Sequence, residues 1–260
     1  MKKKLMALFL AGAMTLSLAA CGGSASSSAA SSEAASSGAA SSEAASSTEE
    51  PITLRIAYMP NYGSLWSLTT AMNKGYFDEA GITVELTEFQ DGPSIIAAME
   101  SGSIDMGYIG QGAHKLCIQG NAKIFALSHV SNGDAVIGGP EVKTLEDLKG
   151  KKVGYSSGTS SEDILKNALE KAGLTMNDIT AVDMDASNIV TAMLSGGVDA
   201  CATWSPNSLK ILEEGKDLTK LCDNTTFSDK TVSLASWIVT PSYAEANADK
   251  ILRFTKALFK

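Results

Sequence analysis

The segment Ser157-Gly-Thr-Ser-Ser161 places hydroxyl side chains and a glycine directly before a stretch with helical periodicity. The unpaired N–H groups and the dipole at the start of a helix favour a bound oxyanion, and a glycine lets a ligand approach the backbone. Glu162 and Asp163 follow in the first turn, where they would oppose an anion, so pure helix capping is the alternative. The residues expected to contact a ligand here are Gly158, Thr159 and Ser160.

Aromatic and amide side chains follow other expected strands. Tyr62 and Trp204 lie in such loops, and rings that meet in a cleft can stack on a flat ligand, although each ring alone could be packing. These loops contain no arginine, so we expect a small organic ligand with an acidic or amide group. Asp185 could bind a ligand amine or serve only in a turn. The remaining expected ligand contacts are Asn61, Trp66, Gln111, Gly112 and Asn132.

No arrangement in the chain is typical of an enzyme or a metal site. No serine lies in a nucleophile elbow and no pair of carboxylates stands out. The histidines, His114 and His129, are too few for a zinc site, and Cys117, Cys201 and Cys222 lack metal-ligand spacing. Cys201 and Cys222 could form a disulfide, or both could be buried free thiols; the sequence leaves both alternatives open. We therefore expect binding without catalysis, cofactor or metal.

The elements that would position these residues occur twice. Ile95-Ile-Ala-Ala-Met-Glu-Ser-Gly-Ser-Ile-Asp105 is echoed by Ile189-Val-Thr-Ala-Met-Leu-Ser-Gly-Gly-Val-Asp199. Each copy has the apolar spacing of a helix, a glycine suited to a left-handed helix end, and a short strand beyond it. So long a period predicts two similar α/β lobes rather than a solenoid, and two lobes imply a cleft. The aspartate that ends each copy is expected to be a turn residue.

Strands and helices are expected to alternate through the chain, which predicts mainly parallel, doubly wound sheets. The expected strands cover residues 54–58, 82–89, 104–109, 124–130, 134–137, 152–155, 182–184, 198–203 and 231–240. Besides the repeated helices, the expected helices cover 65–74 with Ser64 as N-cap, 144–149, 163–172, and Pro241 to Lys260.

These elements divide the folded body into lobes. We expect residues 51–130 to form lobe 1, residues 131–228 to form lobe 2, and residues 229–260 to return to lobe 1. The expected hinges lie near Val130 and Thr231, because a few residues at element ends can absorb a domain motion.

The N-terminal part is expected to be removed or unfolded. Residues 1–20 have the three lysines and the apolar run of an export signal, and the run is short for a membrane span. Residues 21–50 are almost only Ser, Ala, Gly and Glu, which predicts a disordered tether. The chain has a net charge of −8; without the signal's three lysines and the tether's four acids, about −7 remains on residues 51–260. An acidic domain without clustered Lys or Arg is a poor candidate for nucleic acid.

Six segments in order resemble the solute-binding lipoproteins of ABC importers for nitrate, sulfonates, taurine and thiamine-pyrimidine precursors. They are Tyr58-Met-Pro-Asn-Tyr62, Asn73-Lys-Gly-Tyr-Phe-Asp-Glu-Ala-Gly-Ile82, Leu145-Glu-Asp-Leu-Lys-Gly-Lys-Lys-Val153, Ser157-Gly-Thr-Ser160, Leu169-Glu-Lys-Ala-Gly-Leu174 and Trp204-Ser-Pro206. The resemblance covers about residues 52–260 and implies a two-lobed α/β fold of the periplasmic-binding-protein type II class. The family often has Trp-Glu-Pro where this chain has Trp204-Ser-Pro206, which leaves the ligand open.

The resemblance also implies a cellular role. Leu18-Ala-Ala-Cys21 resembles a lipoprotein box, which implies a lipid on Cys21 and an anchor at the extracytoplasmic face of a bacterial membrane. It implies a protein, expected to be a monomer, that captures a small organic solute, anionic or heteroaromatic, and delivers it to an ABC permease with its ATPase. A tethered ligand-sensing domain stays open as an alternative, and an enzyme on the same fold is a remoter one. Family members usually continue for several more helices, so we expect a chain truncated at Lys260.

Overall fold

The computed structural model describes residues 50–260. The expected export signal, Cys21 and nearly all of the expected tether lie outside the described residues. The strands are β1 (Ile52–Tyr58), β2 (Ile82–Glu88), β3 (Met106–Ile109), β4 (Lys123–Ser131), β5 (Ala135–Gly138), β6 (Lys152–Tyr155), β7 (Thr180–Asp183), β8 (Ala200–Thr203), β9 (Thr219–Asp223) and β10 (Ser233–Val239).

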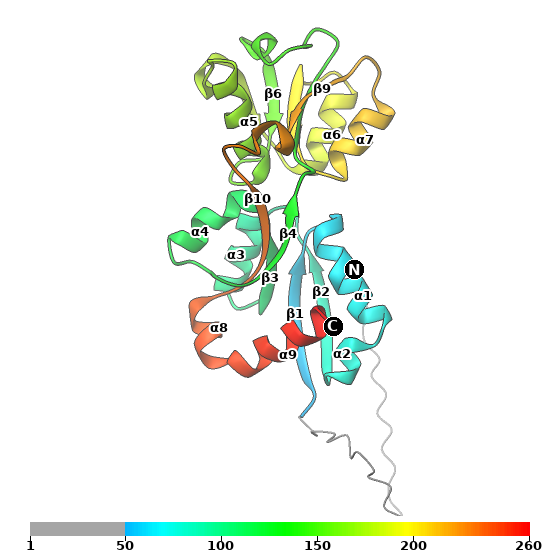
Figure 1. Ribbon diagram of the computed structural model, residues 1–260, viewed down its shortest axis with the longest axis vertical. Helices are drawn as coiled ribbons and strands as arrows, with labels where there is room; N and C mark the ends of the chain where they lie inside the picture. The colour runs from blue at the N-terminus through cyan, green and yellow to red at the C-terminus, as the bar shows by residue number, and fades with distance from the viewer. Residues whose placement is uncertain (1–49) are drawn as a thin grey trace, which may run out of the picture. The chain divides into compact units, whose positions relative to one another are not determined.

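Helices flank these strands (Figure 1). The α-helices are α1 (Tyr62–Asn73), α2 (Tyr76–Glu79), α3 (Gly92–Glu100), α4 (His114–Ile118), α5 (Ser160–Lys171), α6 (Ala186–Leu194), α7 (Asn207–Glu214), α8 (Pro241–Ala246) and α9 (Ala248–Leu258). Short 3-10 helices are η1 (Gln111–Ala113), η2 (Glu146–Leu148), η3 (Met176–Asp178) and η4 (Asn224–Phe227). Within residues 50–260, no helix combines the length and the apolar character needed to cross a membrane.

The strands form two five-stranded sheets, with the orders β2-β1-β3-β10-β4 and β7-β6-β8-β5-β9. In the first sheet β10 runs antiparallel to both neighbours, and in the second sheet β5 does the same. The other strands of each sheet therefore share one direction. The chain passes from β4 to β5 and later returns through β10, and a strand that enters a sheet where the others end must run the opposite way. Two mainly parallel α/β lobes are thus confirmed.

The repeated segments occupy equivalent places in the two lobes. They form α3 and α6, which end at left-handed glycines, Gly102 with φ 77° and Gly196 with φ 71°. Asp105 accepts a hydrogen bond from the backbone N–H of Arg55 in β1, and Asp199 accepts one from the N–H of Lys152 in β6. Through this hydrogen bond each aspartate ties the start of the strand after its helix to the neighbouring parallel strand, which is more than the turn role expected from the sequence.

The lobe-2 sheet is covered on both faces. Leu165 of α5 packs on one face with Cys222, whereas Ile189 of α6 packs on the other with Cys201. The two cysteines pair with adjacent residues of β5, so the alternation of side chains points them to opposite faces. Both are free thiols, and burial raises the pKa of Cys201 to about 12 and that of Cys222 to about 11. The free-thiol alternative is confirmed.

Two expected helix starts differ from the structure. The N-cap of α1 is Asn61, whose Oδ1 accepts a hydrogen bond from the N–H of Ser64 at 2.9 Å; Ser64 itself is buried in the first turn. Helix α5 begins before the expected residue 163 because the hydroxyl of Thr159 accepts the N–H of Ser161. In both cases a short polar side chain captures an unpaired N–H one turn earlier than hydrophobic periodicity indicates.

The single helix expected from Pro241 to Lys260 is also wrong. Asn247 leaves the helical region with φ −137° and ψ 38°, which separates α8 from α9, and α9 ends at Leu258. Asparagine is disfavoured in helix interiors because its side chain competes for the hydrogen bonds of the backbone. The expected helix at 144–149 is only the 3-10 turn η2, and α2, α4, α7 and β9 were not expected.

Candidate functional site

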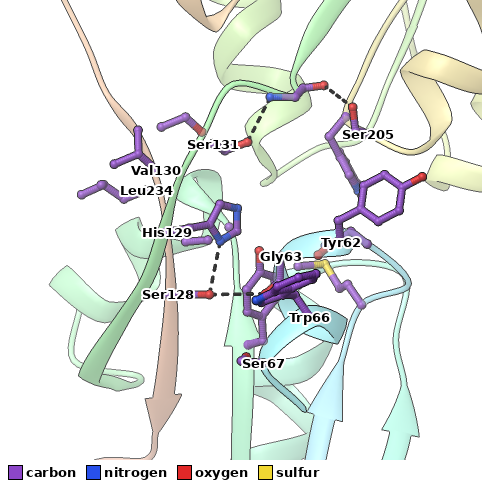
Figure 2. A pocket seen from close by; sticks show the side chains of 18 of the residues that line it. Tyr62, Gly63, Trp66, Ser67, Ser128, His129, Val130, Ser131, Ser205 and Leu234 are labelled. Carbon is purple, nitrogen blue, oxygen red and sulfur yellow. Dashed lines mark hydrogen bonds between the residues drawn. The ribbon is translucent and has the colours of Figure 1, made fainter. Parts of the chain in front are cut away.

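A cavity of about 840 Å³ lies between the two lobes. The start of α1, the turn η1 and the end of β4 line it from the first lobe, and the start of α5 and the loop after β8 line it from the second. Figure 2 labels residues of α1, of β4 and of the loop after β8 around the cavity. The segment between β4 and β5 and the first residues of β10 complete the wall. The cavity therefore occupies the edge at which parallel α/β sheets ordinarily bind ligands.

Most of the expected ligand contacts line this cavity. They are Asn61, Tyr62, Trp66, Gln111, Asn132, Thr159, Ser160 and Trp204. The structure brings together residues as distant in sequence as Asn61 and Trp204, and their contact with a ligand stays a prediction. Gln111 already has one partner, because its Oε1 accepts the N–H of Leu234 at 3.1 Å.

Three expected contacts do not line the cavity: Gly112, Gly158 and Asp185. A Cβ on Gly112 would lie 2.1 Å from the carbonyl carbon of Thr159, so this glycine lets η1 approach α5. Gly158 has φ 74°, and a Cβ there would lie 3.1 Å from Pro93. Asp185 is an exposed N-cap residue of α6 without a capping hydrogen bond. The two glycines thus serve the approach of the lobes.

Exposed aromatic rings project from α1. Tyr62 and Trp66 are four positions apart, which places them on one helix face, and they are 68% and 76% exposed. Trp204 is half-buried and reaches the cavity from the loop after β8. Large aromatic side chains left exposed at a cavity wall mark a surface that a ligand or partner covers. These rings can stack on a flat molecule.

The start of α5 already satisfies several of its own donors. Glu162 accepts the N–H of Gly158 at 2.6 Å, and Asp183 accepts the N–H of Ser157 at 2.9 Å. With the capping bond from Ser161 to Thr159, the loop before α5 has protein acceptors for three of its N–H groups. These contacts favour the capping alternative over an oxyanion site at these donors.

A buried carboxylate, not expected from the sequence, joins the segments that cross between the lobes. Asp134 is 2% exposed and lines the cavity. Its Oδ1 accepts from the hydroxyl of Ser160 at 2.6 Å, and its Oδ2 accepts from Asn224 at 2.8 Å and from Ser233 at 3.0 Å. Asn132 and Gly133 are typical turn residues, and Asp134 directly after them was therefore not among the expected ligand contacts.

A second group that sequence reasoning missed lies on the lobe-1 wall. His129 and Ser128 of β4 line the cavity, and Nδ1 of His129 is 3.2 Å from the hydroxyl of Ser128. That hydroxyl donates to the carbonyl oxygen of Gly63 at 3.4 Å, as the dashed lines in Figure 2 show. The hydroxyl of Ser128 therefore lies within reach of both the imidazole of His129 and a backbone carbonyl oxygen.

Charges on the cavity wall are few. Among the described lining residues, the aspartate, glutamate, lysine and arginine side chains are Asp134 and Lys260, and Lys260 forms an ion pair with Glu79. In the described part of the chain, no three His, Cys, Asp or Glu side chains are grouped to hold a metal ion. The geometry can hold a flat, largely uncharged molecule by stacking and hydrogen bonds.

Known proteins resemble this chain in sequence. A protein of Brucella abortus strain 2308, named as a binding protein, is 37% identical over 181 residues, which cover 69% of this chain and 57% of that protein. The taurine-binding periplasmic protein of Escherichia coli K12 is 25% identical over 182 residues, covering 69% of this chain and 56% of that protein. The chain thus spans little more than half the length of the relatives it matches.

Solved structures resemble it as well. The alkanesulfonate-binding protein SsuA of Xanthomonas axonopodis pv. citri, solved bound to MOPS, superposes with a TM-score of 0.68 at 25% identity, covering 81% of this chain and 73% of that chain. This superposition agrees with the two-lobed type II fold. The family profile described as NMT1/THI5 like matches residues 65–260. The match, the lobed fold and the cavity between the lobes lead to one conclusion: the chain belongs to the NMT1/THI5-like family.

Proposed function

We propose that this protein is the extracytoplasmic solute-binding component of an ABC importer. It captures a small organic solute between its lobes, leaves the solute chemically unchanged, and delivers it to a permease. The observation that carries the proposal is the cavity of about 840 Å³ with walls from both lobes, a volume typical of small-molecule sites. The relatives named as taurine-binding and alkanesulfonate-binding proteins support the same role.

The connections between the lobes support a closing motion. The chain crosses between the sheets at residues 132–134 and again at residues 228–232. A solute that first binds one lobe gains contacts with the other lobe only in the closed state. That difference in affinity shifts the population towards closure, and the closed shape is what a permease would recognise. These crossings support the proposed lobe boundaries, 51–130, 131–228 and 229–260.

The cavity wall favours a heteroaromatic or other flat solute over a bare anion. Tyr62, Trp66 and Trp204 offer ring faces, and Asp134 is a carboxylate without a paired cation among the described residues. A small inorganic anion would meet this negative charge, and the lysine on the wall, Lys260, is already paired with Glu79. The proposed solute therefore binds through a flat apolar portion and a polar group.

The proposed location is the outer face of a bacterial membrane, with the chain attached as a monomer through a lipid on Cys21. Metabolic labelling with a radioactive fatty acid tests the anchor. We expect labelled protein from the natural chain and none from Cys21→Ser; equal labelling of both, or of neither, contradicts the anchor.

Native mass spectrometry of the purified protein, followed by calorimetry with the solute it carries, tests the function. We expect one saturable site, and a smaller radius of gyration by X-ray scattering when the solute is bound. Tight, saturable binding of nitrate with aromatic compounds inert would contradict the proposed solute class. Flat heat and scattering signals across a broad metabolite panel, or turnover of a bound compound, would contradict capture without catalysis.

A further inference from the structure

Tyr108 is a buried tyrosine whose hydroxyl has no hydrogen-bond partner within residues 50–260. Its side chain is 3% exposed, yet it lines the cavity. It lies on β3 and packs edge-on against Trp237 of β10, with ring centroids 5.6 Å apart. Burial raises the pKa of this phenol, so the hydroxyl stays protonated. A buried phenol ordinarily finds an acceptor, and here the cavity is where one can lie.

His129 presents a complementary atom. We assign the proton of the Ser128 hydroxyl to the carbonyl oxygen of Gly63, 3.4 Å away, and in that arrangement the hydroxyl accepts from Nδ1 of His129 at 3.2 Å. Nδ1 therefore carries the proton of the neutral ring, and Nε2 is a bare acceptor. Burial lowers the pKa of His129, which keeps the ring neutral at neutral pH.

The two free atoms converge above Gly63. The position that a Cβ on Gly63 would take lies 2.0 Å from Cε1 of His129, 2.6 Å from the hydroxyl oxygen of Tyr108 and 2.7 Å from Nε2 of His129, so both rings pack on the backbone of Gly63 with these two atoms side by side. The two rings are nearly parallel, with an interplanar angle of 10° and centroids 6.2 Å apart. Ala235 of β10 lies opposite His129 in the sheet and lines the same cavity. Figure 2 shows His129 and Gly63 close together at this place.

We propose that Tyr108 and His129 form a donor–acceptor pair that recognises the edge of a carboxamide-like group on a neutral, flat solute. The phenol donates to the carbonyl oxygen, and Nε2 accepts from the amide N–H. A carboxylate offers only acceptors, so one of its oxygens would face the lone pair of Nε2. This inference rests on the proposed function and adds the chemistry by which the same cavity selects its solute.

Ligand-observed NMR titrations of the full chain test the pair, with benzamide and benzoate as matched probes. At pH 7.5 we expect benzamide to bind at least about tenfold more tightly than benzoate. Tyr108→Phe is expected to weaken benzamide binding about tenfold, the size of one lost hydrogen bond that leaves a buried partner unmet. His129→Gln is expected to reduce the preference for benzamide over benzoate.

Stability measurements separate recognition from folding. The hydroxyl of Tyr108 has no partner among the described residues, so Tyr108→Phe should keep the urea midpoint of the natural protein. Tyr243→Phe on α8, away from the cavity, is the control that should change neither stability nor benzamide affinity.

The proposal is overturned if benzamide fails to bind, if benzoate binds equally well, or if Tyr108→Phe binds benzamide with unchanged affinity. A solute found by native mass spectrometry that lacks a donor–acceptor edge would overturn it while leaving the proposed function standing. If no compound of the metabolite panel is captured, the proposed solute-binding function itself is contradicted.

Discussion

The carboxylate of Asp134 accepts a hydrogen bond from the hydroxyl of Ser160 at 2.6 Å and thereby joins the first crossing between the lobes to the first turn of α5. The same carboxylate accepts from Ser233 at the start of β10, the strand that returns to the first lobe. One buried charge therefore fastens both crossings to the second lobe. Its position at a helix start is electrostatically favourable.

Asp134→Asn should destabilise the protein. The amide nitrogen would face donors that now meet a carboxylate oxygen, so we expect a loss of roughly 2–3 kcal/mol in the free energy of unfolding. Urea denaturation measures it, and Asp229→Asn, at an exposed position without a side-chain hydrogen bond or ion pair among the described residues, is the matched control. Equal midpoints for the two variants would contradict the role of Asp134.

Thr159→Val should also cost stability. The hydroxyl of Thr159 accepts the N–H of Ser161 and donates to the carbonyl oxygen of Ser156, and valine keeps the shape but removes both bonds. We expect a loss of about 1–2 kcal/mol in the free energy of unfolding. Thr159→Ser should recover most of it. A Thr159→Val protein as stable as the natural one would indicate that the hydroxyl serves the ligand rather than the helix.

Trp66→Ala should weaken solute binding without changing stability. The ring is 76% exposed, so its removal takes little from the core, whereas a stacked solute would lose a large contact. We expect affinity for the captured solute to fall about tenfold or more, with the thermal midpoint within a few degrees. Trp66→Phe should keep most of the affinity. If calorimetry finds the same affinity for Trp66→Ala as for the natural protein, Trp66 does not contact the solute.

Gly112→Ala should hold the lobes apart at their closest approach. The new Cβ would lie 2.1 Å from the backbone of Thr159, a distance that forces η1 or α5 to move. We expect a larger radius of gyration by X-ray scattering and weaker solute binding. Gly110→Ala, where a Cβ meets nothing within 4 Å, is the matched control. Identical scattering profiles of the two variants would contradict this account.

Stability should fall as the pH is lowered through the range in which His129 titrates. Burial, opposed by the nearby charge of Asp134, holds the pKa of His129 below its ordinary 6.5. Between that lowered pKa and 6.5 the unfolded chain binds more protons than the folded chain, so the free energy of unfolding rises with pH.

Other titratable groups must be separated from His129 in this measurement, and the variant His129→Gln serves as the control. Tyr108 stays protonated throughout, because burial raises its pKa. Half-buried His114 also has a pKa lowered by burial and contributes with the same sign. Urea denaturation between pH 5.5 and 7.5 should therefore show a smaller pH dependence in His129→Gln than in the natural protein. Equal slopes would show that His129 titrates alike in both states.

Local chemistry in the sequence was enough to predict the lobes. The repeated helix, its terminal glycine and the strand beyond it are set by contacts within a few residues, so Gly102 and Gly196 were predicted correctly. Most expected strands were found for the same reason: alternation and apolar runs act locally. Loops at the carboxyl ends of parallel strands meet at one edge of each sheet and were expected to face the gap between the lobes, which is why Tyr62 and Trp204 were both expected there.

Only the tertiary structure decided what each polar group does. Asp134 lies in a turn-like segment and His129 within an expected strand, and neither neighbourhood reveals that one faces Ser233 and the other Tyr108. The opposite faces of Cys201 and Cys222 depend on their registers against β5. Such pairings join residues tens of positions apart, because hydrogen bonding and burial are decided by neighbours in space. Sequence patterns report only neighbours along the chain.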